Sequence, residues 1–362
     1  MKYLGLLFLL LPIAGQVYIS WHLWRMLPAL LPLRIAVVTL ITLAFLAIFL
    51  SFSGINDRVP MGLATCIYEV GTSWIMILLY LVMLYLLLDL GGLVHLVPKS
   101  FMHASWAGSI TVAVLMTGIF TYGYVHYNHK VRVPLDLTTT KHLDRPMRLV
   151  MISDVHLGYH NRRAHLHRWL QLIAREKPDA VLIAGDLIDG SIRPVAQEKM
   201  AEEFRALKMP VYAIYGNHNY YTGLRPDREF CQQAGITLLQ DSVAYLGDVA
   251  IVGRDDRTNV GRHTLQQVMA GIDRSKYIIE MDHQPYHLEE AERCGVDLEF
   301  AGHTHYGQVW PISWIVDAIY EDGFGPYQRG NTRYYVSSGL GIWGGKFRIG
   351  TRSEYVVATL HN

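Results

Sequence analysis

Four long apolar segments near the start of the chain constrain its fold most strongly. They cover about residues 3–24, 35–52, 72–97 and 107–125. A helix of about 20 apolar residues is long enough to cross the hydrocarbon core of a bilayer. Only 17% of the chain is charged, and few of these charges fall within the four segments. We therefore expect residues 1–128 to form a membrane domain of four transmembrane helices.

Two alternatives to this membrane domain are disfavoured by the sequence. A cleaved signal peptide is the first, but the opening apolar run is long and lacks a small-residue cleavage site where one is expected. A soluble helical bundle is the second, and four such runs with so few charges argue against it. Aromatic residues also gather near the ends of the segments, as in interfacial belts: Trp21, Trp24, Trp74, Trp106, Tyr122, Tyr124 and Tyr127.

Basic residues near the segment ends predict the orientation. With four spans, one side of the membrane carries Lys2, Arg58, Lys130, Arg132 and Lys141, and the other carries Arg25, Arg34 and Lys99. The positive-inside rule then places the C-terminal half in the cytoplasm. Asp89, near the end of the third segment, is an ionisable group of the kind that marks functional sites in membranes. Its closeness to Gly91 and Gly92 favours a solvated helix end instead.

The composition and the hydrophobic pattern of the sequence change after the membrane segments. Residues 129–146 are polar and are expected to form a linker. From residue 147 to 362, short apolar runs alternate with amphipathic helical patterns, which is typical of an α/β domain. The net charge of +1 and the lack of a clustered basic stripe give no support for a nucleic-acid partner.

Five predicted strands in this half end in loops that carry Asp, Asn or His. The clearest is the run Ala180–Asp189, in which a buried strand pattern ends abruptly in Gly185-Asp186. In open α/β sheets the carboxyl ends of strands form the ligand crevice, so these loops should converge. Mixed imidazole and carboxylate donors without thiolate suit manganese, iron or zinc. The donors offered by the five loops are Asp154, His156, Asp186, Asn217, His218, His283, His303 and His305.

Each of these motifs alone has an ordinary structural explanation. Gly216-Asn217-His218 read in isolation is a turn, because Gly and Asn accept a left-handed backbone. A single histidine such as His156 is more often a hydrogen-bonded core residue than a metal ligand. The ordered set of five motifs, each following a strand, favours a metal centre over these separate explanations.

The motif set resembles the calcineurin-like metallophosphoesterase superfamily. The resemblance rests on Asp-x-His at 154–156, Gly-Asp-x-x-Asp at 185–189, Gly-Asn-His at 216–218, His283 and Gly-His-x-His at 302–305. The closing run 337–341, with Arg348, Gly350 and Glu354, is similar to a bacterial branch of membrane-associated phosphodiesterases and phosphatases. The resemblance implies a sandwich of two sheets flanked by helices, with two divalent metal ions (Mn, Fe or Zn, with Mn favoured).

The resemblance also implies a role for each matching residue. Asp154, His156, Asp186 and His305 would hold one metal, and Asp186, Asn217, His283 and His303 the other, so that Asp186 bridges the two. His218 would act in catalysis by protonating the leaving oxygen or steadying the transition state. Asp189 would hold its loop. Hydroxide generated from a water shared by the metals would attack phosphorus in line.

The sequence departs from the family pattern at two positions. Asn219 follows Gly-Asn-His, where an acidic residue is common, which puts the orientation of His218 in question. Tyr306 stands where the branch has Gly, which predicts a narrower crevice mouth. Substrate signals are weaker: several arginines near the loops are candidates for phosphate binding, with a solvated face as the alternative. These are Arg162, Arg163, Arg168, Arg254 and Arg257.

These observations predict a membrane-anchored phosphoesterase acting on a phosphodiester, phosphomonoester or pyrophosphate. The spans and the aromatic segment 310–324, which otherwise packs as a cap over the sheet, suggest a lipid-linked substrate: a phospholipid or a lipid-linked sugar nucleotide. We expect a multi-pass protein of the bacterial inner membrane. The alternatives are a non-catalytic membrane scaffold or sensor with a phosphoesterase-like fold, and spans that transport a solute. The sequence leaves the oligomeric state open.

Overall fold

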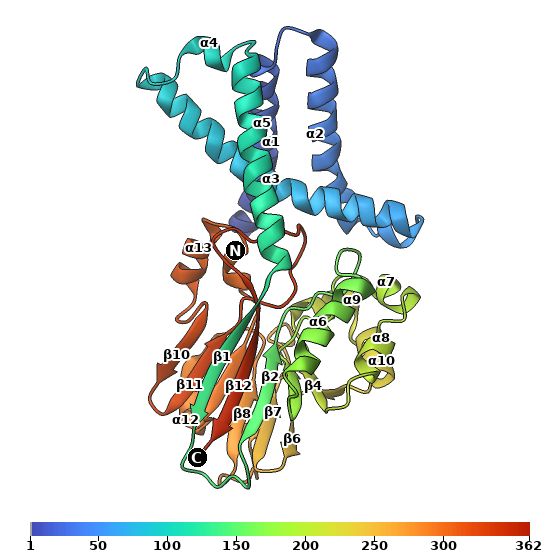
Figure 1. Cartoon of the computed structure of the whole chain (residues 1–362), viewed down its shortest axis with the longest axis vertical. Coiled ribbons are helices and arrows are strands. Elements are labelled where there is room, and N and C mark those ends of the chain that lie inside the picture. Colours follow the sequence, from blue (N-terminus) through green and yellow to red (C-terminus); the bar gives the residue numbers. More distant parts are fainter. Residues whose placement is uncertain (1) are drawn as a thin grey trace. The chain divides into compact units, whose positions relative to one another are not determined.

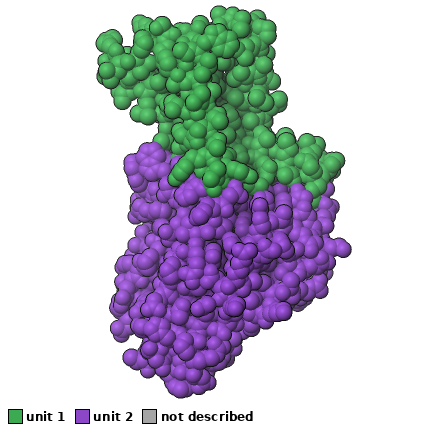
Figure 2. Space-filling view, in the orientation of Figure 1, with its two compact units in different colours: residues 1–125, 344–347 green, residues 126–343, 348–362 purple. Residues whose placement is uncertain are grey.

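The computed structural model describes residues 2–362, with side chains described from residue 10 onward. The chain divides into two compact units, which Figure 2 shows in different colours. Unit 1 comprises Met1–Val125 and Gly344–Phe347, and unit 2 comprises His126–Trp343 and Arg348–Asn362.

Unit 1 is built from helices (Figure 1). They are α1 (Lys2–Met26), α2 (Leu31–Phe52), the short 3₁₀ turn η1 (Ile55–Asp57), α3 (Met61–Leu93), α4 (Lys99–Met102) and α5 (Trp106–Asn128). Within the described residues, three helices are long and apolar enough to cross a membrane: α2, α3 and α5. Three of the four expected spans therefore coincide with such helices. The remaining expected span, residues 3–24, falls in α1, where residues 3–9 lie outside the described side chains and leave too short a described segment.

Helix α3 is the longest element of unit 1. Its 33 residues span about 50 Å at 1.5 Å per residue, which exceeds the roughly 30 Å hydrocarbon core. Such a helix must tilt or extend beyond the core. It packs against α1 and α2, most closely at Gly71, where a Cβ would lie 2.5 Å from the backbone nitrogen of Ile48. Only glycine permits that approach.

A short segment from near the end of the sequence also belongs to unit 1. Within Gly344–Phe347, the Lys346 Nζ atom lies 2.7 Å from Glu69 Oε1 on α3. The ring of Phe347 meets that of Phe120 on α5 edge to face, with centroids 4.7 Å apart. Glu69 is therefore paired with a cation supplied from far along the sequence, as expected for an ionisable group in a membrane helix.

Unit 2 contains two six-stranded sheets. The first has the order β1-β12-β2-β3-β4-β5. Its strands are β1 (Lys130–Thr138), β2 (Met147–Ile152), β3 (Ala180–Ile183), β4 (Val211–Ile214), β5 (Thr237–Leu239) and β12 (Ser353–His361). The second has the order β10-β11-β9-β8-β7-β6. Its strands are β6 (Ser242–Leu246), β7 (Val249–Gly253), β8 (Tyr277–Met281), β9 (Leu298–Ala301), β10 (Gly325–Arg329) and β11 (Thr332–Val336).

Alternation along the strands builds a core on both faces of the first sheet. In β2, Leu149 and Met151 join an apolar cluster with residues of the second sheet such as Ile279 and Phe300. Val150 and Ile152 point to the opposite face and join a cluster with helical residues. Successive side chains of a strand face opposite ways, and a strand buried on both faces is apolar throughout. The expected two-sheet sandwich flanked by helices is confirmed.

The helices of unit 2 are mostly short. They are α6 (Arg163–Arg175), α7 (Ile192–Gln197), α8 (Ala201–Arg205), α9 (Asn217–Thr222), α10 (Leu224–Ala234), α11 (Leu265–Val268), α12 (Leu288–Cys294), the 3₁₀ turn η2 (His305–Gly307) and α13 (Ile312–Ile319). Helices α6, α8 and α10 contribute Leu166, Phe204 and Phe230 to the core over the first sheet.

The prediction that residues 129–146 form a linker is wrong for half of this segment. Residues Lys130–Thr138 form β1, which pairs in parallel with β12 from Lys130↔Ser353 to Thr138↔His361. The alternation of Val131, Val133, Leu135 and Leu137 has the two-residue period of a strand. Pro134 is compatible with the strand because β1 lies at the edge of the sheet.

Candidate metal centre

The carboxyl ends of five strands deliver the predicted donors to one place. Strands β2, β3 and β4 are parallel neighbours in the first sheet, and β8 and β9 are parallel neighbours in the second. Each of the five is followed within five residues by a donor. Parallel strands present their carboxyl ends at the same sheet edge, so donors up to 151 positions apart in sequence become neighbours.

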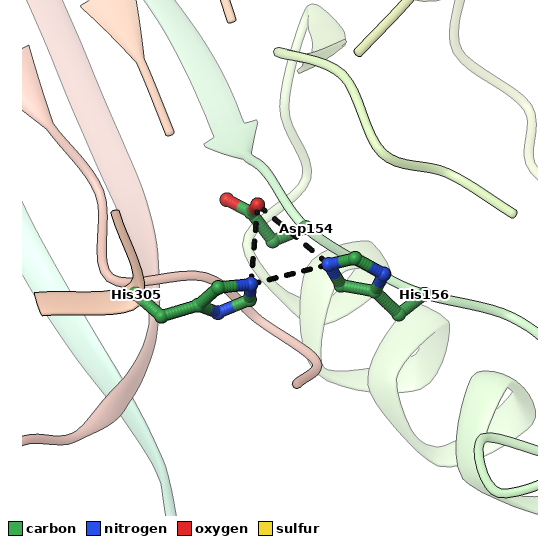
Figure 3. A group of neighbouring side chains, drawn as sticks. All are labelled: Asp154, His156 and His305. Carbon is green, nitrogen blue, oxygen red and sulfur yellow. Dashed lines mark hydrogen bonds and ion pairs between the residues drawn. The ribbon is translucent and has the colours of Figure 1, made fainter. Parts of the chain in front are cut away.

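The first group of donors is Asp154, His156 and His305 (Figure 3). The Nε2 atoms of the two histidines lie 3.1 Å apart. Asp154 Oδ1 is 3.5 Å from His305 Nε2 and 3.8 Å from His156 Nε2. All three side chains are buried. Two ring nitrogens and a carboxylate oxygen therefore converge on one point within the protein.

The second group is Asn217, His283 and His303. The Asn217 Oδ1 atom lies 3.2 Å from His283 Nε2 and 2.8 Å from His303 Nδ1. His283 Nδ1 donates to the carbonyl oxygen of Ala184 at 2.9 Å. This bond fixes the ring so that Nε2 faces the other donors, the arrangement commonly found for metal-binding histidines.

Asp186 lies between the two groups. Its Oδ2 atom is 3.1 Å from His283 Nε2 and 3.7 Å from His156 Nε2. Its other oxygen, Oδ1, accepts a hydrogen bond from the backbone nitrogen of His218 at 2.9 Å. One carboxylate thus borders both groups, which is the position that a bridging ligand requires.

The donor set fits two divalent cations. Two buried imidazole nitrogens at 3.1 Å repel each other unless at least one of them carries a proton or both face a metal ion. The Nδ1 atom of His305 is buried without a hydrogen-bond partner among the described residues. Nitrogen and oxygen donors without thiolate are preferred by manganese, iron and zinc in mixed sites. Asp154, His156, Asp186 and His305 would hold one ion, and Asp186, Asn217, His283 and His303 the other.

The pKa values of two site histidines show that the carboxylates of this site stabilise positive charge beside them. Burial alone would lower the pKa of His283, but the charge and hydrogen bond of Asp186 outweigh it and raise the pKa to about 10. The pKa of His156 is likewise raised to about 10, against burial, mainly by Asp154 and Asp189. Without metal the protonated rings supply the cationic charge, and metal binding must displace their protons.

The two histidines of the last loop behave in the opposite way. Burial, together with the charge of His283, lowers the pKa of His303 to about 4. Burial lowers the pKa of His305 to about 3, against the pull of Asp154. Both rings are therefore neutral at physiological pH and offer lone pairs to a cation.

The backbone at the donors is strained. Five of them have a positive φ: Asp154 (52°), His156 (48°), Asp186 (50°), His303 (70°) and His305 (48°). Residues other than glycine rarely adopt this region, and such outliers concentrate at functional sites. The neighbouring backbone is equally constrained, because a Cβ at Gly216 would lie 2.2 Å from Asp186 Oδ1. The tight loops aim the donors inward.

His218 stands beside the donors and is held by Asp189. Its Nδ1 atom lies 2.7 Å from Asp189 Oδ1, and its ring meets that of His156 edge to face at 4.7 Å. Burial would raise the pKa of Asp189, but its contacts with His156 and His218 lower it well below the usual value. Asp189 is therefore ionised and fixes the ring of His218 from the Nδ1 side, a more specific role than the loop-holding one predicted.

The two departures from the family pattern have local explanations. Asn219 is buried, accepts from the Gly216 backbone nitrogen at 2.7 Å and donates to Asp227 Oδ2 at 2.6 Å. Asn219 thus ties the Gly216 loop to a carboxyl group of α10. Tyr306 has a φ of 46°, a conformation that suits glycine, and its ring stacks on Phe324 at 4.7 Å.

Four of the five arginines noted in the sequence are either paired with glutamates or exposed. Arg162 pairs with Glu198, Arg163 pairs with Glu202 and Glu203, and Arg254 is buried against Glu280 at 3.2 Å. Arg168 is exposed.

Arg257 differs from these arginines. Its Nη1 atom is buried without a hydrogen-bond partner among the described residues, and its guanidinium lies 4.1 Å from the ring centre of Tyr286. Tyr286 bonds to Tyr320, whose ring neighbours that of His303 at 6.4 Å. Arg257 is therefore the candidate for phosphate contact at this edge of the site.

Arg348 holds loops around the centre through hydrogen bonds to their backbone. The sequence motif gave no means to predict this role. Arg348 is buried, and Nη1 donates to the carbonyl oxygen of His305 at 2.7 Å. Nη2 donates to the carbonyl oxygens of Ser338 and Gly341. Burial lowers the pKa of Arg348 to about 10, so it stays charged at neutral pH and holds the loop beside Asp154.

Comparisons with known proteins agree with this geometry. Residues 147–307 match the family model described as calcineurin-like phosphoesterase. A metallophosphoesterase of Helicobacter pylori is 29% identical over 218 residues, which cover 59% of this chain and 59% of that protein. One from Campylobacter jejuni is 30% identical over 227 residues, covering 60% of each chain. The chain thus spans about three fifths of the length of these relatives.

A further relative extends over both units. The transmembrane protein with metallophosphoesterase domain of Danio rerio is 27% identical over 345 residues, which cover 87% of this chain and 78% of that protein. Together with the three apolar helices, this similarity indicates a membrane protein. The family model, the sandwich of two sheets and the converging donors all concern the same part of the chain: residues 147–307 are similar to the calcineurin-like phosphoesterases.

Proposed function

We propose that the protein is a membrane-anchored phosphoesterase that uses two divalent metal ions to hydrolyse a phosphodiester, phosphomonoester or pyrophosphate bond. The observation that carries the proposal is the position of Asp186, whose carboxylate borders two separate groups of buried donors. The alternative, a non-catalytic scaffold or sensor, predicts gaps in the donor set. All seven predicted ligand positions hold a donor that faces another member of the set.

The residues of the site divide the work of such a reaction. When bound, a pair of divalent cations neutralises phosphoryl oxygens and lowers the pKa of a water enough to make it a nucleophile. Asp186 fixes the separation of the two groups. Asp189 holds His218 through Nδ1, so Nε2 is the ring atom available to exchange a proton with the leaving oxygen. Asn217 is neutral, which limits the negative charge facing the substrate phosphate.

Manganese is the metal we favour. The seven donors comprise four imidazoles, two carboxylates and one amide oxygen, a mixture that manganese accepts more readily than calcium, which prefers oxygen alone. Iron and zinc are the competing candidates.

A lipid-linked substrate is supported by an exposed apolar face on α13. Trp314, Ile315 and Ile319 are 57% to 64% exposed, while Val316 and Ser313 face inward. Trp310, which precedes the helix, is also exposed. Helices with a Trp-rich apolar face are suited to lie in the membrane interface. The substrate we propose is a phospholipid or a lipid-linked sugar nucleotide in the bacterial inner membrane, with unit 2 on the cytoplasmic side, the side richer in Lys and Arg.

Hydrolysis of a chromogenic phosphodiester by the full chain in detergent tests the proposal. With added manganese we expect turnover that a chelator abolishes, and Asp186→Ala should remove both activity and bound metal. Asp273→Ala is the matched control, because Asp273 is exposed and belongs to none of the possible metal-ligand groups among the described residues. Equal activity in the native chain and in Asp186→Ala would refute the proposal.

A further inference from the structure

Unit 1 contains a polar pocket of about 170 Å³. It lies between the C-terminal ends of α1 and α3 and the short helix α4. Its polar lining consists of His22, Arg25, Asp89, Lys99 and His103. Ionisable groups are costly in a membrane domain, and five of them around one cavity call for a functional explanation.

Asp89 lies exposed near the end of α3, as expected, but it is held on one side and open on the other. Its Oδ2 atom accepts a hydrogen bond from the Tyr18 hydroxyl at 2.6 Å and lies 3.0 Å from His22 Nε2. The His22 side chain is buried, with ring contacts to Tyr18, Trp21 and Tyr85. The Asp89 side chain nevertheless keeps 44% of its surface exposed. The carboxylate is therefore fixed in direction and accessible from the pocket.

Two cations face the same space. The Arg25 guanidinium lies 4.4 Å from the ring centre of Trp21 and contacts His103 Nε2. His103 Nδ1 donates to the Lys99 carbonyl oxygen at 2.9 Å, and its Nε2 accepts from Arg25. Among the described residues, no hydrogen bond or ion pair engages Lys99 Nζ. With neutral histidines the pocket carries two positive charges and one negative charge.

The surroundings place the pocket at the depth of lipid headgroups. Trp21, Trp24 and Trp106 are exposed at the same end of unit 1, as in an aromatic belt at the membrane interface. Leu86, Leu87 and Leu90 of α3 are also exposed, and Leu86 and Leu87 lie less than one turn before Asp89. A lipid with its headgroup in the pocket can lay its acyl chains on this apolar surface.

We propose that this pocket binds the headgroup of a phospholipid that carries both a phosphodiester and a primary ammonium group, as phosphoethanolamine does. Arg25 and Lys99 bind the phosphate, and Asp89 accepts hydrogen bonds from the ammonium. A quaternary ammonium has no N–H to donate to Asp89. An anionic headgroup without an amine places its phosphate next to an unpaired carboxylate. The pocket therefore selects for the primary amine.

Native mass spectrometry of the full chain in detergent tests this assignment. The probes are phosphatidylethanolamine, phosphatidylglycerol, phosphatidylcholine and soluble O-phosphoethanolamine, added separately. We expect phosphatidylethanolamine to bind about tenfold or more tightly than the other two lipids, the effect of one charge-assisted contact. Asp89→Asn should reduce this preference to less than about threefold, the residue of a weakened polar contact. Lys99→Ala should weaken binding of all three lipids.

The controls separate this proposal from a general loss of structure. Arg58→Ala removes an exposed arginine between η1 and α3 and should leave all lipid affinities unchanged. Lys99→Ala loses no described partner and should unfold at the same temperature as the native chain. Equal binding of the three lipids by the native chain, or an unchanged preference in Asp89→Asn, overturns the proposal. Binding of soluble O-phosphoethanolamine as tightly as the lipid overturns the assignment to a lipid.

Discussion

The two donor groups of the metal centre differ in how far they are closed off from solvent. The sealed group, Asp154, His156 and His305, is buried throughout. In the open group, formed by Asn217, His283 and His303, only His283 is fully buried, and the other two are partly exposed. Substrate must approach a site from its exposed side. We infer that the open group meets the substrate first and that the sealed group retains its metal more firmly.

The supports behind the two groups differ as well. Arg348, a buried cation, bonds to the carbonyl oxygen of His305 in the sealed group. The loop of the open group is held through Asn219 by the buried carboxyl of Asp227. A guanidinium keeps its charge over the whole physiological range, whereas a buried carboxyl titrates. The support of the open group should therefore respond to pH where the support of the sealed group does not.

The largest expected effect comes from removing one ligand from each group. His305→Ala should lower activity by about 10³-fold, the upper cost of losing one transition-state contact, and should leave at most one metal ion per chain. His303→Ala should lower activity by about 10- to 100-fold, as for weakened metal support, and should bind more metal per chain than His305→Ala. Elemental analysis by plasma mass spectrometry measures both. Equal metal loss in the two variants would contradict the distinction between the groups.

The next largest effect should come from His218, which neither group uses as a ligand. His218→Asn should lower kcat by about 10²- to 10⁴-fold, the usual contribution of a general acid, with metal content unchanged. Asp189→Asn should lower kcat less, by about 10- to 100-fold, because Asp189 acts by orienting His218. If His218→Asn also lost metal, His218 would belong to the open group and the proposed proton transfer would fall.

A smaller effect is expected at the rim of the open group. Arg257→Ala should raise KM by about tenfold, because a hydrogen bond to a charged phosphate contributes about 1.5–3 kcal/mol, and should change kcat less. Arg163→Ala is the matched control, since Arg163 is engaged by Glu202 and Glu203. Steady-state kinetics on one phosphodiester decide the matter. An unchanged KM would place the substrate phosphate elsewhere.

The smallest effect concerns stability and pH. Burial raises the pKa of Asp227 to about 7 in the folded protein, above the value near 3.9 of an unfolded chain. The associated stability is therefore complete below about pH 4 and is lost as the pH rises through about 7.

Asp227→Asn, which cannot ionise, tests this linkage. It should be more stable than the native chain at pH 8 by roughly 1–4 kcal/mol and similar to it at about pH 4. Thermal unfolding of the full chain in detergent at the two pH values measures the difference. A gain of equal size at both values would show that Asp227 stays protonated or stays charged throughout.

The sequence revealed the donors because they depend on local patterns. Asp186 could be placed because a short apolar run ends at Gly185, and the same logic applies to His283 after β8. What could not be predicted depends on pairing between distant residues. Nothing near Asp89 indicates Tyr18, which lies 71 positions away. Arg348 bonds to backbone carbonyl oxygens, and these leave no trace in residue identity. Strand β1 was mistaken for a linker because its polar ends and Pro134 outweighed its alternating valines and leucines.

The pairing of β1 with β12 has a consequence for how far catalysis can reach. The expected linker of 18 residues would have behaved as a loose leash with a mean span of roughly 20–25 Å. Instead, only His129 separates the last residue of α5 from the first residue of β1. A connection of one residue lacks the freedom of movement that a flexible linker would give. Under the proposed function, such a tether would favour esters held at the bilayer surface, which lateral diffusion brings past repeatedly, over esters dissolved in bulk water.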